Sequence, residues 1–97
     1  MPRKERILQT KILRDLCSLG RFCVAFDIIK CGEDGVPDIF FTTENTGAIF
    51  IEAKDPDGVL SKKQEDMVAN LKSCGVKAAV IWSWQEWVEF KRRIGLG

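Results

Sequence analysis

Two acidic residues and one lysine, Asp38, Glu52 and Lys54, have the types and the spacing to do chemistry together. Each acid lies at the outer end of an apolar segment, and polar residues 44–47 separate the two segments, which is typical of a β-hairpin. Pairing centred on Asn45 places Asp38 opposite Glu52. Side chains alternate along a strand, so Lys54 points to the same face as Glu52. The sequence therefore predicts that the three side chains converge at one end of a hairpin.

Two carboxylates that face each other in this way create an electrostatic conflict. They repel across a sheet, and burying them unpaired costs several kcal/mol or forces one of them to take a proton. A bound divalent cation removes the conflict, and hard oxygen ligands select Mg²⁺ or Mn²⁺ over zinc. We therefore expect Asp38 and Glu52 to be the main metal ligands, with the backbone carbonyl of Ala53 as a further oxygen. Lys54 would orient or deprotonate a water molecule, and the site would hydrolyse a phosphodiester.

Three short motifs surround this site: Gly35-Val36-Pro37-Asp38, Glu52-Ala53-Lys54 and Ser61-Lys62-Lys63-Gln64. Together they resemble the VRR-NUC (virus-type replication-repair nuclease) branch of the PD-(D/E)xK nuclease superfamily. It implies a restriction-endonuclease-like α/β core and metal-dependent hydrolysis of nucleic acid. It also implies that Glu5, on a first helix, contributes to the metal site directly or through water. Gln64 would face the site and help to hold the catalytic lysine or a phosphate.

Both of these further residues have a second interpretation that needs no resemblance. Glu5 is in the first turn of a predicted helix, where an acid is favoured by the helix dipole. Ser61 and Gln64 have the spacing of a capping box, in which the glutamine only completes the helix start. For Gln64 the two roles are compatible.

The resemblance further implies a substrate and an assembly. It favours an endonuclease that cuts branched or junction DNA in replication, recombination or repair, often as a homodimer with two active sites. Two alternatives stay open: a catalytically idle nucleic-acid-binding or assembly subunit of the same fold, and an RNA-cleaving enzyme. The presence of Asp38, Glu52 and Lys54 together favours the enzyme.

The elements that must position these residues follow from hydrophobic periodicity and capping signals. The predicted order is α-β-β-β-α-β-α, with helices over 3–19, 61–73 and 83–94 and with strands over 22–31 and 76–82 flanking the hairpin. The first three strands should form an antiparallel meander. The last strand should run parallel to the one carrying Glu52, through a right-handed crossover. Near-continuous apolar runs predict a mixed sheet flanked by helices, with the 22–31 strand buried on both faces.

Composition limits the remaining possibilities. The chain has 97 residues and a net charge of +1, so we expect one stand-alone domain, 1–97, without a strong global field. Two groups of basic residues lie near the ends, where they could bind phosphate or simply be solvated. They are Arg3, Lys4, Arg6, Lys11 and Arg14, and Lys91, Arg92 and Arg93.

The four cysteines lack a CxxC pair, and the chain has no histidine, which argues against a zinc site. We expect the cysteines to be reduced core residues of a cytoplasmic protein, in the host cell if the protein comes from a phage or another virus. No membrane segment is recognisable, so no membrane partner is expected. Large apolar residues predict a two-fold homodimer, because so small a chain cannot obviously bury them all. They are Phe22, Val59, Leu60, Trp82, Trp84 and Trp87.

Overall fold

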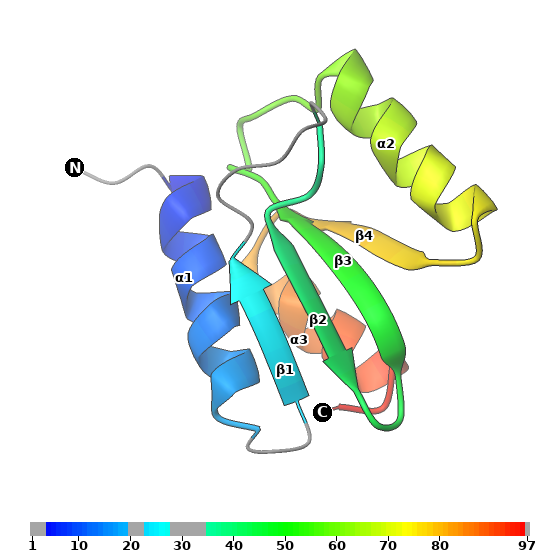
Figure 1. The fold of residues 1–97 in the computed structure, drawn as a ribbon. Helices are drawn as coiled ribbons and strands as arrows, with labels where there is room; N and C mark the ends of the chain where they lie inside the picture. Colours follow the sequence, from blue (N-terminus) through cyan, green and yellow to red (C-terminus); the bar gives the residue numbers. More distant parts are fainter. Residues whose placement is uncertain (1–3, 20–22, 28–34, 97) are drawn as a thin grey trace.

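The fold follows the predicted order of elements (Figure 1). The structure, a computed structural model, describes residues 4–19, 23–27 and 35–96. Its elements are α1 (Lys4–Cys17), β1 (Cys23–Asp27), β2 (Ile39–Thr43), β3 (Gly47–Ala53), α2 (Lys62–Ser73), β4 (Lys77–Ile81) and α3 (Trp84–Arg93). None of the helices in these described residues is long and apolar enough to span a membrane.

The four strands form one mixed sheet in the order β1-β2-β3-β4. The first three are antiparallel neighbours, and β4 runs parallel to β3 after the crossover through α2. In the hairpin, Phe40 pairs with Phe50 and Thr43 with Gly47. Both the meander and the hairpin register are confirmed.

The two faces of the sheet differ in how completely they are covered. Helices α1 and α3 cover one face, where their apolar side chains enclose the fully buried strand residues, while α2 lies beside β4 (Figure 1). On the other face, Phe40 and Phe50 are only half-buried, with ring centroids 5.1 Å apart. The core lies between the sheet and the α1–α3 layer, and its central residues are Ile12, Leu16, Ile39, Phe41, Ile49, Ile51 and Trp87.

The prediction that the first strand is buried on both faces is wrong for Val24, whose side chain is 50% exposed. Strand β1 lies at the end of the sheet opposite β4. Because α2 packs against β4, no helix of the described residues covers the β1 end of that face. The rest of the predicted strand, 28–31, and its first residue, Phe22, lie outside the described residues.

The expectation that the cysteines belong to the core is wrong for Cys17 and Cys74, whereas Cys23 packs against the core. Cys17 and Cys74 are exposed, and Cys23 is intermediate; all three are free thiols. Cys17 is the last residue of α1, and Cys74 is the C-cap of α2, so both lie where a helix ends at the surface. Cys31 lies outside the described residues.

A partly buried polar contact joins α1 to α3. The Asp15 carboxylate accepts hydrogen bonds from Trp87 Nε1 at 2.8 Å and Lys91 Nζ at 2.7 Å, both at Oδ2. Burial alone would raise the pKa of Asp15, but the bonds from Lys91 and Trp87 outweigh it and lower the pKa. Trp87 is fully buried and meets Phe41 edge to face. This contact therefore fixes the tryptophan at the centre of the core.

Asp15→Ala removes both of these contacts and is expected to lower the free energy of unfolding by about 2 kcal/mol at pH 7, measured by urea denaturation. The folded-state pKa of Asp15 is lowered, so its contribution is complete above the ordinary value of 3.8 and is lost as the pH falls through the lowered pKa. The difference between the two proteins should therefore shrink in acid. Asp66→Ala, which removes only an exposed pair with Lys62, should change little. If both variants lost the same free energy of unfolding, the stabilising role of Asp15 would be contradicted.

Candidate active site

The acidic pair lies where the β2–β3 hairpin opens. Ile39 pairs with Ile51, so Asp38 and Glu52 are the next residues facing each other along the two chains. Asp38 Oδ2 accepts a hydrogen bond from the backbone N–H of Ala53 at 3.2 Å. The predicted convergence of Asp38 with the Glu52–Ala53 segment is therefore present in the structure.

The two carboxylate oxygens of Glu52 differ: one accepts a hydrogen bond, and the other has no partner among the described residues. Its side chain is only 3% exposed. Oε1 accepts a hydrogen bond from Gln64 Nε2 at 2.9 Å, whereas Oε2 is buried and has no hydrogen-bond partner within the described part of the chain. A buried carboxylate oxygen without a donor is costly, so it must be explained by strain, by a proton or by a bound ion.

The electrostatics of Glu52 show the same conflict. The pKa of Glu52 is raised from 4.5 to about 7, chiefly by burial and also by the carboxylates of Asp38 and Glu5. The charge of Lys54 and a hydrogen bond from the Asp38 backbone act in the opposite direction. Near neutral pH this carboxyl group is therefore divided between its neutral and ionised forms, unless a cation balances its charge.

Helix α2 begins at the site, which explains how Gln64 reaches Glu52. Ser61 Oγ accepts from the Gln64 backbone N–H at 3.1 Å, and Gln64 Oε1 accepts from the Ser61 backbone N–H at 2.9 Å. The capping box is complete, and the amide nitrogen of the same side chain donates to Glu52. Gln64 therefore caps the helix and also faces the site, and the site residue that it contacts is Glu52.

Gly35 allows the chain leading to Asp38 to approach α2. Its φ is +83°, and a Cβ there would lie 2.6 Å from the carbonyl oxygen of Lys63. Any side chain would be strained by the backbone conformation and would also clash with α2. Sequence reasoning did not assign this role, and its only signal was a glycine three residues before Asp38.

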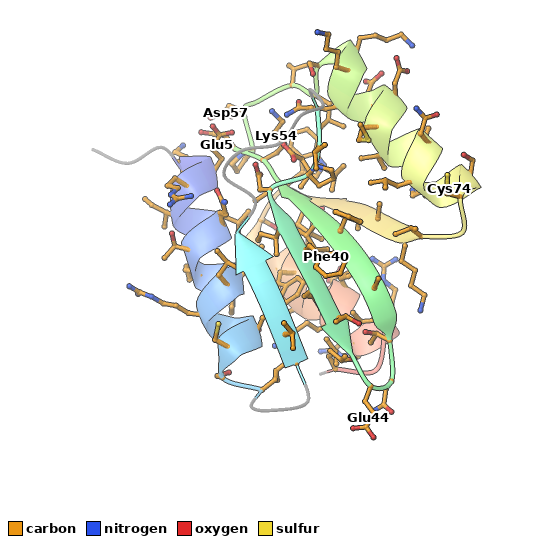
Figure 2. The ribbon with its side chains drawn as sticks, in the orientation of Figure 1. Glu5, Phe40, Glu44, Lys54, Asp57 and Cys74 are labelled. Carbon is orange, nitrogen blue, oxygen red and sulfur yellow. The ribbon has the colours of Figure 1, made fainter. Side chains whose placement is uncertain are left out.

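The structure places Lys54 and Glu5 at this end of the molecule (Figure 2). The Lys54 backbone N–H donates to the Ile81 carbonyl at 2.9 Å, which continues the pairing of β3 with β4. Both side chains act electrostatically on Glu52, as described above. Glu33 and Asp34, two loop acids near this site in sequence, lie outside the described residues.

The oxygen atoms at this site, from two carboxylates, are suited to bind a hard cation. Within residues 4–19, 23–27 and 35–96, no three or more His, Cys, Asp or Glu side chains are arranged to hold a metal together. Glu5 therefore does not complete a three-carboxylate set with Asp38 and Glu52. The unpaired Oε2 of Glu52, the neighbouring Asp38 carboxylate and the adjacent Ala53 backbone are all oxygen donors suited to Mg²⁺ or Mn²⁺.

An α-β-β-β-α-β-α core with two acids and a lysine at the open end of its hairpin defines a nuclease-like fold and site of the PD-(D/E)xK type. The family model of the VRR-NUC domain matches residues 5–84, and the chain belongs to this family. No curated protein sequence matches the chain significantly. Membership of the family implies nuclease activity, a hydrolase function, with DNA as the substrate.

Glu52→Gln is expected to raise the free energy of unfolding of the metal-free protein, measured in EDTA. A pKa raised from 4.5 to about 7 corresponds to roughly 3 kcal/mol at pH 8. The neutral carboxyl of the wild type contributes stability below pH 4.5, and this contribution is lost as the pH rises through 7. The gain from glutamine should therefore be largest above pH 7 and vanish in acid. Glu44→Gln, at the exposed hairpin tip, should show no such gain; equal behaviour of the two variants would contradict the buried charge.

Proposed function

We propose that this protein is a Mg²⁺- or Mn²⁺-dependent endodeoxyribonuclease that cuts branched or junction DNA. The observation that carries the proposal is the buried Glu52 carboxylate, with one unpaired oxygen, beside Asp38 and Lys54. A purely structural role gives no reason to bury an acid next to another acid, because the arrangement costs stability. A metal-dependent site requires both of them.

Asp38 and Glu52 would hold the metal, with the Ala53 carbonyl as a third oxygen and Glu5 acting through water. When bound, the cation lowers the pKa of a water molecule and polarises the scissile phosphate. Gln64 occupies one oxygen of Glu52, which would leave the other oxygen available to a cation, as residues that orient metal ligands do.

Lys54 would act on the water and on the phosphate. Its Nζ would orient the water or accept its proton, and it would offset the negative charge that develops on the phosphate oxygens. The pairing of its backbone with Ile81 fixes the start of this side chain, although it lies beyond the last residue of β3. The role needs this fixed start, because a mobile lysine would lose positioning.

Substitutions separate these roles. Asp38→Asn should weaken Mn²⁺ binding strongly in calorimetric titration and abolish cutting of a four-way junction. Lys54→Ala should retain metal and DNA binding but reduce the cleavage rate by about 100-fold or more. Lys72→Ala, an exposed lysine at the far end of α2, is the matched control and should cut normally.

The substrate panel tests the remaining parts of the proposal. Junction, flap, plasmid, duplex and RNA would be incubated with Mg²⁺, Mn²⁺ or EDTA. Cleavage that persists in EDTA would overturn the metal dependence. Binding without any cleavage would favour an idle nucleic-acid-binding subunit, and preference for RNA would favour the RNA-cleaving alternative.

The proposal includes a two-fold homodimer. Fewer of the large apolar residues are exposed than the sequence indicated. Trp87 is part of the core, and Trp82 and Trp84 are half-buried, whereas Val59 is 82% exposed in the segment between Lys54 and α2. Exposed apolar residues beside the site would be covered if two sites faced one substrate.

Sedimentation velocity at micromolar concentration should therefore show a species of about twice 11.0 kDa. Val59→Ser should shift this species toward the monomer, because it removes an exposed apolar contact. A clean 11.0 kDa species with full activity would contradict the dimer. Glu44→Gln, at the opposite end of β3, is the control that should leave the mass unchanged.

A further inference from the structure

A hollow of about 280 Å³ opens between the start of α1 and the start of α3. Its walls are mainly apolar, and two lysines contribute the charge. We call it the indole pocket, after its two tryptophans. The residues that line it include Ile7, Leu8, Trp82 and Trp84, with Lys4 and Lys11.

The indole pocket and the acidic pair share one edge of the sheet. Lys54 binds the backbone of Ile81, and Trp82 is the next residue of the chain. Pro56, which also lines the pocket, is two residues beyond Lys54. Lys4, on the other wall, precedes Glu5, whose charge acts on Glu52. A ligand in the pocket would therefore lie beside the catalytic end of the hairpin.

The lysines of the pocket are placed to meet an anion. Lys11 Nζ lies 4.7 Å from the centroid of the Trp84 ring, a cation–π contact that keeps the ammonium group at the pocket wall. Lys4 Nζ is 3.7 Å from Asp57 Oδ2, and both side chains are largely exposed. Such an exposed pair contributes little, so Lys4 can exchange the carboxylate for a phosphate.

The walls suit a flat, partly apolar group. Trp82 and Trp84 are half-buried and present indole surface. Ile7 is 47% exposed, although Leu8, Ile12 and Leu16 of the same helix are buried. Aromatic walls with cations beside them are how proteins bind single-stranded nucleic acid, by stacking bases and neutralising phosphates. The volume lies just below the usual range for ligand pockets, which favours one planar group over a duplex.

We infer that the indole pocket receives one unstacked nucleobase from the single-stranded part of a branched DNA, next to the phosphodiester to be cut. Lys4 and Lys11 contact the phosphates on either side of that base. The inference rests on the proposed function and adds to it the feature by which the enzyme recognises a branch. A fully paired duplex has no free base to insert, so it binds less tightly.

The test changes the DNA first, which leaves the protein intact. A fluorescent duplex with a single-stranded flap would be titrated with the protein in EDTA, and fluorescence anisotropy would report affinity without cleavage. One abasic nucleotide would be placed in turn at each position nearest the junction. At one position the missing base should weaken binding of the wild type about tenfold, because stacking is lost while the phosphate remains. Equal affinity at every position would overturn the inference.

Protein variants then assign the effect to the pocket. Trp84→Leu should bind the intact and the abasic flap with equal affinity, because the stacking partner is absent from both. Lys11→Ala should weaken both by the same factor, because it removes a phosphate contact, and Lys72→Ala should bind like the wild type. If Trp84→Leu keeps the full tenfold discrimination, the base binds elsewhere and the assignment is wrong. Circular dichroism would confirm that each variant is folded.

Two further readouts separate this inference from the nuclease proposal and from protein docking. Binding in EDTA does not need catalysis, so base discrimination without cleavage would overturn only the nuclease proposal. Cleavage without base discrimination would overturn only the indole pocket. If Trp84→Leu instead converts a dimer to a monomer without changing the discrimination, the pocket is a protein interface and the inference fails.

Discussion

The burial of the Glu52 carboxylate beside that of Asp38 is the constraint on which the structure depends. Three elements meet to hold this one group. The hairpin register brings Asp38 across from it, α2 supplies the amide of Gln64, and the parallel pairing with β4 fixes the backbone at Lys54. None of these contacts satisfies the second carboxylate oxygen. The site is therefore held in a geometry that the protein alone does not favour, which is how active sites commonly trade stability for function.

The opposite face of the same strand compensates for this. Alternation along β3 sends Glu52 toward α2 and sends Ile51 and Ala53 into the core beneath α1 and α3. There the Asp15 carboxylate has two strong donors, and its pKa is lowered, whereas that of Glu52 is raised. The partly buried Asp15 and the buried Glu52 thus make opposite contributions to stability. At neutral pH the Asp15 carboxylate stabilises the fold, whereas the Glu52 carboxylate destabilises it.

Features set by local rules could be predicted from the sequence. The hairpin register follows from the turn residues and the alternation of the two arms, and Ser61 with Gln64 needs only the spacing of a capping box. Features set by the packing of distant elements could not. Val24 is exposed because α2 covers the other edge of the sheet, and Gln64 contacts Glu52 because of where that helix begins. Gly35 was visible only as a motif residue, since its clash partner is 28 positions away in the chain.

The sequence did not predict which of the three tryptophans would be buried. They are close in sequence, yet Trp87 is fully buried whereas Trp82 and Trp84 line a pocket. Trp82 follows the last residue of β4, Ser83 caps α3, and the helical turn then carries Trp87 to the Asp15 side while Trp84 stays near Lys11. A count of aromatic residues predicts only excess apolar surface. Their separation into core and pocket depends on where α3 begins, and the hydrogen bond from Trp87 to Asp15 holds that helix against α1. The contact that stabilises the core therefore also holds the helix that carries Trp84 of the indole pocket.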